Sequence, residues 1–213
     1  ISCSLVGSEM CIRDSVMSYS IPIETSARHI HLCRQDFEAL FGKGKELTFK
    51  ANLSQPGQYV AEERLTVTGP KGTFENVAIL GPFRSETQLE ISMTDTRKLG
   101  VPAVIRQSGD TADTPGCTLT GPLGSIDIDH GVIVAKRHIH MTPFQALQMR
   151  VKDKDEVFVI MESYERSLIF ADVIVRVDPN FALAMHVDTD EANAFANYDH
   201  PTGVILKLFG GRT

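Results

Sequence analysis

A pentapeptide occurs twice in this chain, near residue 30 and again near residue 140. The segment Arg28–Leu32 (RHIHL) is repeated at Arg137–Met141 (RHIHM). With seven histidines in 213 residues, chance gives only about 0.2 His-x-His pairs, so two pairs in the same local context indicate a duplication. We therefore predict a fold made of two related halves, each of which carries one His-x-His pair.

Each histidine pair has a candidate third metal ligand further along its half. Leu89–Asp95 aligns with Met185–Asp190 when one gap is allowed, which puts Glu90 and His186 at equivalent places. Alternate residues of a strand share a face, so the two imidazoles of each pair converge. One such pair on an edge strand is often only half-buried and polar, but two copies with matching third donors favour metal sites. The predicted metal ligands are His29, His31 and Glu90 in one set and His138, His140 and His186 in the other.

The two predicted sets differ in charge. A His-His-Glu set leaves a divalent cation with one net positive charge, whereas a His-His-His set leaves both charges, and each set has an open position for water or substrate. Neutral imidazole and carboxylate suit zinc, so we predict two catalytic zinc ions per chain. Taken alone, His29, His31 and Glu90 also match the facial triad of a mononuclear non-haem iron oxygenase. A non-catalytic zinc-binding interaction module is the other alternative, and it would need His130 or His200 to close each site.

Arginines near the predicted ligands are expected to have two different roles. Arg84 lies in the same short segment as Glu90, where a planar guanidinium can clamp a phosphate or carboxylate beside a metal. Arg28 and Arg137 directly precede ligand histidines, so they should point to the opposite face of their strands and form structural ion pairs. Spacing alone makes Arg84 a candidate for anion binding and catalysis, with an ordinary surface arginine as the alternative.

Composition and charge exclude several classes of protein. The chain has 27 acidic and 21 basic residues, for a net charge of −6, which disfavours a nucleic-acid partner and favours a small anionic ligand held locally. The apolar runs are much shorter than the roughly 20 residues that a membrane span needs. The four cysteines show no CxxC spacing, which is typical of a reducing compartment. We expect a cytoplasmic protein with neither a membrane nor a nucleic-acid partner.

Most of the chain is predicted to form short strands rich in Val, Ile, Leu and Phe and separated by Gly- and Pro-containing turns. Short helices are expected at 33–41, 94–98, 142–149 and 189–196, and the Gly- and Pro-rich stretch 108–124 is expected to be a loop. Many short strands at this spacing favour barrels or sandwiches. The predicted strands are Glu46–Lys50, Glu63–Thr68, Phe74–Ile79, Gln88–Ser92, Ala103–Gln107, Gly131–Ala135, Glu156–Met161, Leu168–Val177, Ala182–His186 and Gly203–Leu208.

The two helices that follow the histidine pairs should differ in stability. Thr142 followed by Pro143 is a strong combination for starting a helix, because the threonine caps the free backbone N–H groups and proline fits the first turn. Cys33 occupies the corresponding place in the first half, where serine or threonine would be expected. We predict a weaker helix start at Cys33.

The first fifteen residues are expected to differ in origin from the rest of the chain. They lack the cationic start and long apolar core of a signal peptide. Glu9–Ser15 (EMCIRDS) matches the translation of a transposon-end adapter used in sequencing libraries. We therefore predict that residues 1–15 are a non-native N-terminal scar.

Several motifs, in the same order, resemble the PduL-type phosphate propanoyltransferases, which are phosphotransacylases associated with bacterial microcompartments. They are the doubled RHIH, GPFRSETQLE at 81–90, IRQSGD at 105–110, GPLG at 121–124 and MHVDTDEAN at 185–193. The resemblance covers residues 20 to 208 and implies the reaction acyl-CoA + phosphate ⇌ acyl phosphate + CoA. Propanoyl-CoA or acetyl-CoA would be the acyl donor, and the partners are then these small molecules, with a homo-oligomer compatible with the sequence.

The resemblance also implies a mainly β fold of two small β-barrel domains related by the repeat and capped by short helices. One domain would comprise residues 16–27 plus 136–208 and the other residues 28–135. The family pattern assigns one zinc to His29, His31 and Glu90, the other to His138, His140 and His186, and phosphate contact to Arg84. Microcompartment members carry an N-terminal amphipathic helix, and Val16–Ala27, interrupted by Pro22, is too short to form one. Encapsulation is therefore unsupported by this sequence.

Overall fold

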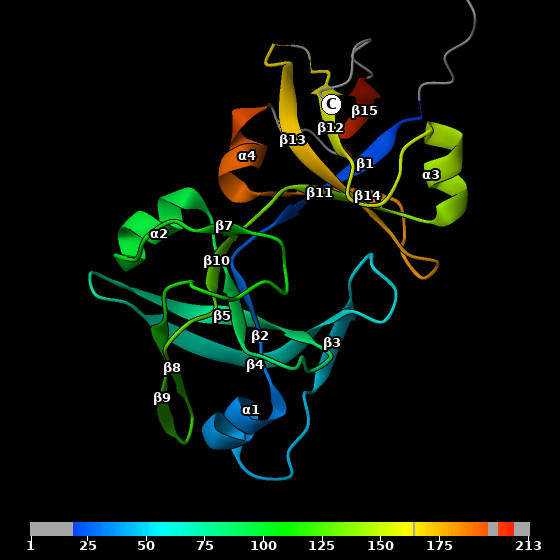
Figure 1. The fold of residues 1–213 in the computed structure, drawn as a ribbon. Coiled ribbons are helices and arrows are strands. Elements are labelled where there is room, and N and C mark those ends of the chain that lie inside the picture. Colours follow the sequence, from blue (N-terminus) through cyan, green and yellow to red (C-terminus); the bar gives the residue numbers. More distant parts are fainter. Residues whose placement is uncertain (1–18, 164, 196–199, 207–213) are drawn as a thin grey trace, which may run out of the picture.

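The computed structural model describes residues 19–163, 165–195 and 200–206, so the predicted scar at 1–15 lies outside the described residues. Fifteen strands and four short helices follow one another in these ranges (Figure 1). None of these helices has the length and apolar character needed to cross a membrane. The elements are β1 (Ile21–Ser26), β2 (His29–His31), α1 (Arg34–Phe41), β3 (Phe49–Asn52), β4 (Tyr59–Thr68), β5 (Thr73–Gly81), β6 (Gln88–Glu90), α2 (Met93–Leu99), β7 (Ile105–Arg106), β8 (Cys117–Gly121), β9 (Gly124–Ile128), β10 (Val132–Ala135), β11 (His138–Met141), α3 (Pro143–Met149), β12 (Glu156–Met161), β13 (Leu168–Val177), β14 (Ala184–Asp188), α4 (Thr189–Ala194) and β15 (Thr202–Leu206).

The strands form two sheets that lie one above the other in Figure 1. Six strands close into a barrel in the order β1-β14-β11-β13-β12-β15. The other nine form a sheet in the order β7-β10-β6-β2-β5-β4-β8-β9, with β3 paired to β4. The prediction of a mainly β chain with short helices is confirmed. The second sheet is a half-barrel, because its end strands β7 and β9 do not pair with each other. The proposed domain limits at 27/28 and 135/136 stay a prediction.

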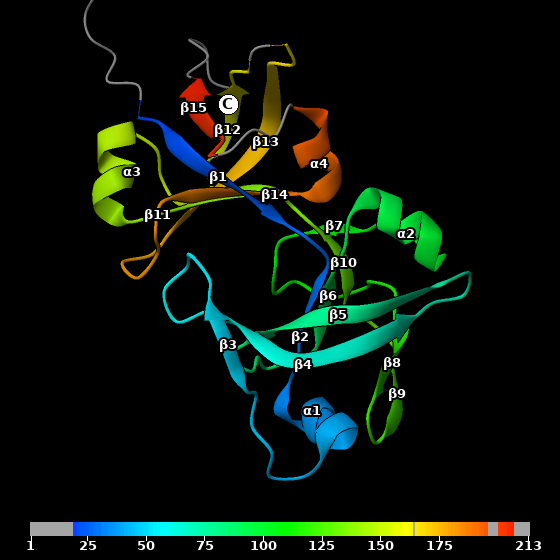
Figure 2. The ribbon, with the colours of Figure 1, turned by 180° about the vertical axis from the view of Figure 1, so that it is seen from behind.

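The chain crosses between the two sheets at equivalent points of the repeat. In Figure 2, β1 of the barrel continues into β2 of the half-barrel. In the second half, β10 of the half-barrel leads into β11 of the barrel. Each His-x-His pair therefore opens the strand that directly follows a crossing. This is why both pairs lie where the two sheets meet.

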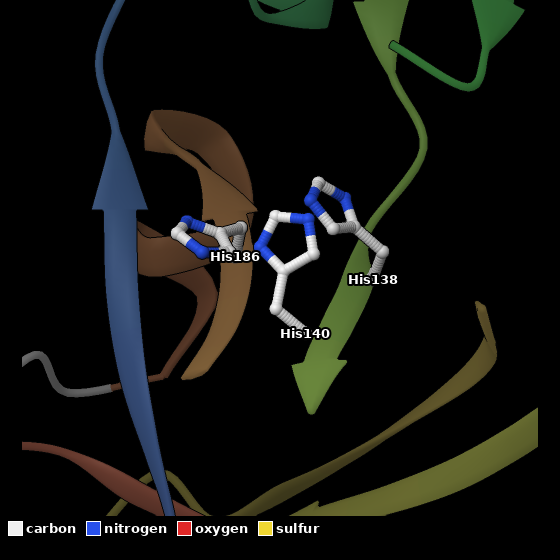
Figure 3. A group of neighbouring side chains, drawn as sticks. All are labelled: His138, His140 and His186. Atoms are coloured by element: carbon white, nitrogen blue, oxygen red, sulfur yellow. The ribbon is translucent and has the colours of Figure 1, made fainter. Parts of the chain in front are cut away.

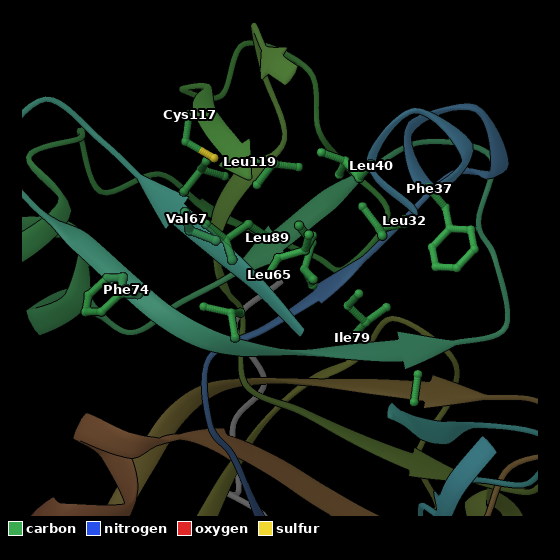
Figure 4. Packing of buried hydrophobic residues seen from close by; sticks show 14 of the residues in the cluster. Leu32, Phe37, Leu40, Leu65, Val67, Phe74, Ile79, Leu89, Cys117 and Leu119 are labelled. Atoms are coloured by element: carbon green, nitrogen blue, oxygen red, sulfur yellow. The ribbon is translucent and has the colours of Figure 1, made fainter. Parts of the chain in front are cut away.

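Each sheet has its own hydrophobic core, and the repeat contributes the same residue to both. Ile30 and Ile139, the middle residues of the two His-x-His sequences, are fully buried in separate clusters. Figure 4 shows part of the first cluster, where Leu65 and Val67 of β4 pack against Leu89 of β6. Because neighbouring residues of a strand face opposite sides, burying the isoleucines turns the histidines toward the other face.

Two predictions about local structure need correction. The loop expected at 108–124 is wrong at its C-terminal end, because β8 lies inside it and forms a hairpin with β9. Cys117 and Leu119 of β8 alternate into the core, a signal that the surrounding glycines and prolines obscured. The strand expected at Glu46–Lys50 is displaced to β3, where pairing with β4 begins only at Phe49. The strands at Glu156–Met161 and Leu168–Val177 are confirmed at both ends.

The two helix starts differ as predicted. Before α3, the Thr142 hydroxyl accepts a hydrogen bond from the Gln145 backbone N–H, and the Gln145 side chain accepts one from the Thr142 backbone N–H. This reciprocal pair satisfies two free donors of the first turn. Before α1, the Cys33 side chain makes no capping hydrogen bond. The first helix therefore starts without the side-chain support that the second one has.

Candidate metal centres

The first set of predicted ligands converges across two antiparallel strands. His29 and His31 lie on β2, and the register places Glu90 of β6 directly opposite His29. Glu90 Oε2 lies 3.6 Å from His29 Nε2, and Glu90 Oε1 lies 3.8 Å from His31 Nε2. These separations exceed hydrogen-bonding distance. They suit donors that each hold one shared ion at about 2.0–2.2 Å.

The second set repeats this arrangement in the barrel. His138 and His140 lie on β11, and His186 of the antiparallel strand β14 is directly opposite His138. Figure 3 shows the three rings facing one another, with centroid separations of 4.6, 4.9 and 5.2 Å. In each set the candidate donor atoms lie within 4.8 Å of one another. Glu90 and His186 thus occupy equivalent register positions, as the sequence alignment predicts.

Hydrogen bonds orient the first histidine of each pair in the same way. His29 Nδ1 lies 2.8 Å from the Ala27 carbonyl oxygen, and His138 Nδ1 lies 2.8 Å from the Lys136 carbonyl oxygen. When a carbonyl accepts a hydrogen bond from Nδ1–H, the lone pair of Nε2 is free to bind a metal ion. This arrangement is common among metal-binding histidines.

The second histidine of each pair carries a buried nitrogen without a partner. Among the described residues, Nδ1 of His31 and Nδ1 of His140 are enclosed and make no hydrogen bond. Burying such a group unsatisfied is costly. Ligation of a metal ion would remove that cost only for a ring that ligates through Nδ1 itself. The convergence of three donor atoms within 4.8 Å of one another in each set fits a metal ion in both sets.

Burial sets the protonation of most of the rings. Burial, with repulsion from the neighbouring imidazoles, lowers the pKa of His31 to about 3, of His138 to about 4 and of His140 to about 2. Burial also lowers the pKa of His186. These rings are neutral at pH 7, which is the form that binds metals.

For Glu90 and His29, burial is instead outweighed by the attraction between these two groups, which sets the direction of both pKa shifts. Burial alone would raise the pKa of the Glu90 carboxyl, but His29 and His31 hold it well below its usual value. Burial would lower the pKa of His29, and the attraction of the Glu90 carboxylate outweighs it, so that pKa is raised. The first set therefore contains an ionised carboxylate, whereas the second consists of imidazoles alone.

Two residues that sequence reasoning missed support Glu90. The Gln88 side-chain amide donates to Glu90 Oε1 at 2.6 Å, and the Ser108 hydroxyl donates to the same oxygen at 2.7 Å. The Gly109 backbone N–H in turn donates to Gln88 Oε1 at 2.7 Å. Gln88 and Glu90 are two residues apart on one strand, so the sequence could have indicated that their side chains share a face and contact each other. The loop that brings Ser108 to the site gave no such signal.

Arg84 lies beside the first set, and Ser108 connects it to Glu90. Its backbone N–H donates to the Leu32 carbonyl, next to His31. Its Nη1 donates to Ser108 Oγ at 2.8 Å. Burial lowers the pKa of this guanidinium, which has no carboxylate partner among the described residues. Arg84 and His31 line a cavity of about 340 Å³ together with Pro56, Gly57, Gln58, Gly81 and Pro82.

The two sets meet in a small cavity between the sheets. Its volume is about 20 Å³, and residues of both sets line it, namely His29 and Glu90 from one side and His138 and His186 from the other. The molecule thus presents one composite site with six candidate donors.

The remaining sequence candidates lie outside this composite site. Arg28 forms a bidentate ion pair with Asp95 at 2.8 and 2.9 Å, and Arg137 pairs with Glu191 at 3.1 Å, so the expected structural role of both arginines is confirmed. His130 is exposed and hydrogen-bonded to the neighbouring Asp129 side chain. His200 is exposed as well. Neither belongs to a metal-capable group within the described ranges.

Comparison with known proteins adds the family. A family model described as phosphate propanoyltransferase matches residues 22–198. The chain belongs to the phosphate propanoyltransferase family. Relatives of that name include proteins of Enterococcus faecalis (55% identical over 185 residues, 87% of each chain), Thermotoga maritima (57% over 174 residues, 82% of this chain and 83% of the relative) and Salmonella typhimurium (50% over 201 residues, 94% of each). As a member of this family the chain is a transferase, as the sequence predicts.

Membership of the phosphate propanoyltransferase family also bears on the two alternatives. An oxygenase built on His29, His31 and Glu90 gives no reason for the second set, which the barrel nevertheless assembles. A closed zinc module would need His130 or His200 near a set, and neither joins one among the described residues. Neither alternative is favoured.

Proposed function

We propose that this chain interconverts acyl-CoA plus phosphate with acyl phosphate plus CoA, using two zinc ions and Arg84. Propanoyl-CoA and acetyl-CoA are the proposed acyl donors. The observation that carries the proposal is the composite site, where residues of both donor sets line one cavity and Arg84, which has no carboxylate partner among the described residues, is joined to Glu90 of the first set through Ser108. Family membership supports the reaction class.

Under this proposal, His29, His31 and Glu90 would hold one zinc ion and His138, His140 and His186 the other. Zinc supplies Lewis-acid stabilisation for negative charge that develops on oxygen or sulfur. It suits these donors because imidazole and carboxylate are its ordinary ligands in catalytic sites.

Arg84 would bind and orient phosphate. Ser108 holds one guanidinium nitrogen at 2.8 Å, so the fork has a fixed direction, and its remaining N–H donors have no partner among the described residues and could bind an anion. One phosphate oxygen would then attack the thioester carbonyl carbon. A carbon–oxygen bond forms, the carbon–sulfur bond breaks, and its electron pair leaves with the CoA thiolate. Burial of the site keeps water from competing as the nucleophile.

Direct attack by phosphate is favoured over an acyl-enzyme intermediate. Burial raises the pKa of the Cys117 thiol to about 12, so this residue stays protonated and unreactive at neutral pH. Cys33 is a free cysteine whose backbone N–H donates to Thr87, and its thiol makes no hydrogen bond to a base among the described residues. The Ser108 hydroxyl donates to Glu90, but its oxygen accepts hydrogen bonds from Arg84 and Gln88, so it is occupied rather than free to attack a thioester.

Elemental analysis combined with a turnover assay tests the proposal. The purified protein is expected to contain two zinc ions per chain. It should release free thiol from propanoyl-CoA and acetyl-CoA only when phosphate is present, and the acyl phosphate formed should be trapped as a hydroxamate. Chelation should abolish turnover and added zinc should restore it. One iron per chain without thiol release would overturn the proposal in favour of the oxygenase.

A further inference from the structure

A second guanidinium lies beside the His138, His140 and His186 set. Arg176 is on β13, which runs parallel to β11, and the register places it opposite His140. Neighbouring strands are about 4.8 Å apart, and residues in register point to the same face. The Arg176 side chain therefore leaves the barrel wall on the same side as the histidines. The Phe181 ring contacts both residues, with its centroid 4.2 Å from that of the His140 ring and 5.8 Å from the Arg176 guanidinium carbon.

The Arg176 guanidinium is partly buried and has no polar partner. Within the described residues it makes no hydrogen bond and no ion pair. Among the described residues, two other partly buried arginines also lack a carboxylate partner, but both make side-chain hydrogen bonds to other groups. Arg64 donates to two backbone carbonyls, and Arg84 donates to Ser108. A guanidinium carries five N–H donors, so leaving all of them unpaired in a partly desolvated place is costly.

Arg84 and Arg176 come from different sheets, and each lies beside one of the two donor sets that share the small cavity. Each is within electrostatic reach of the Glu90 carboxylate, and Arg176 is one of the charges that disfavour the protonated form of Arg84. Two cations that repel each other and form no ion pair within the described ranges make a place for an anion. The cations held by the two donor sets under the proposed function would add to this positive field.

We propose that Arg176 is a second anion-binding residue of the active site, which holds a phosphoryl oxygen together with Arg84. The identity of the anion rests on the proposed function. A fork–fork contact with Arg84 uses two phosphate oxygens, and a further oxygen remains for a second donor group. The same oxygens are kept when phosphate becomes acyl phosphate, so Arg176 serves both directions of the reaction.

The test measures phosphate binding directly as well as turnover. Arg176→Met keeps the length and apolar stem of the side chain, Arg176→Lys keeps the charge but not the fork, and Arg166→Met removes an exposed arginine from the same half as a control. Zinc-loaded proteins are titrated with inorganic phosphate by calorimetry, and KM values for phosphate and acyl-CoA are determined. Arg176→Met should weaken phosphate binding about 10-fold or more, with a smaller loss for Arg176→Lys. Zinc content, KM for acyl-CoA and the control variant should not change.

Arg84→Ala, measured alongside, separates failure of this inference from failure of the proposed function. Normal phosphate affinity in both Arg176 variants, with weakened affinity in Arg84→Ala, overturns the role of Arg176 alone. Normal phosphate affinity in Arg84→Ala as well overturns the proposed function. A change confined to the KM for acyl-CoA would assign Arg176 to the phosphates of CoA and contradict the proposal. If Arg176→Met does not fold, the Arg176→Lys result decides.

Discussion

The two donor sets share one backbone plan but are held in place differently. In both, a His-x-His strand faces its third donor across an antiparallel pair and has a parallel strand on its other side. Glu90 of the first set is fixed by Gln88 and Ser108, which belong to its own half. His186 of the second set is contacted from the other half, because the Gln55 side-chain amide lies 3.4 Å from its Nε2.

Gln55 connects the two halves through more than this one contact. Its side chain is buried, donates to the Ala182 carbonyl at 3.0 Å and accepts from the Ala182 backbone N–H at 3.2 Å. These bonds fix the chain just before β14, the strand that carries His186. A duplicated backbone thus gave two similar sets of donors, while later side-chain differences made one set self-contained and the other dependent on its neighbour.

The largest expected effect comes from removing one ligand of the all-histidine set. His140→Ala should reduce zinc from two ions to one per chain. Because ligand loss exceeds the 10- to 100-fold effects typical of residues behind the ligands, turnover should fall more than about 100-fold even though His29, His31 and Glu90 are intact. Metal analysis and the thiol assay measure both quantities, and His200→Ala should be nearly silent. Retained turnover with one metal per chain would remove the two-metal mechanism.

The next effect concerns Arg84, which the comparison places with the self-contained set. Arg84→Lys keeps the charge and loses the fork, and Arg84→Ala loses both, so rates should fall in the order Arg, Lys, Ala. One charge-assisted hydrogen bond contributes about 1.5–3 kcal/mol, so kcat/KM should drop about 10- to 150-fold per lost contact, with phosphate as the varied substrate. Arsenate should show the same defect, and zinc content should not change. Loss of metal from Arg84→Ala would instead make this residue part of the scaffold.

A smaller effect, on zinc affinity, should show that His186 depends on a residue of the other half whereas Glu90 does not. Gln55→Ala frees the chain before β14, so zinc affinity at the His138, His140 and His186 set should fall about 10-fold while the other set is unaffected. Stepwise competition with a chromophoric chelator resolves the two affinities. Gln148→Ala, an exposed substitution on α3, is the matched control. Equal weakening of both sets would contradict the dependence inferred here.

The smallest effect is on stability, and it compares the two helix starts. Thr142→Ala removes the reciprocal cap of α3 and should cost about 1 kcal/mol of unfolding free energy. Cys33→Ser introduces a capping hydroxyl at α1 and should add about 0.5–1 kcal/mol. Denaturant titration measures both changes. A destabilised Cys33→Ser variant would mean that this thiol contributes more by packing than a hydroxyl gains by capping.

The sequence by itself determined the repeat, and with it the six candidate donors and the structural role of Arg28 and Arg137, while the family resemblance singled out Arg84. The donors and the two structural arginines follow from local regularities, because alternation along a strand fixes which residues share a face wherever that strand lies. The strands Glu156–Met161 and Leu168–Val177 were predicted for the same reason, since turn residues separate them clearly. The hairpin containing β8 was missed where glycine and proline interrupt the alternation.

Only the tertiary structure decided which neighbours complete the site. Gln55 bonds to Ala182 across 127 residues of sequence. Ser108 and Arg176 reach the donors through a loop and a neighbouring strand whose positions no local pattern encodes. Periodicity specifies the face of a strand, whereas the partner of that strand depends on how two separate cores pack, which is a property of the whole chain.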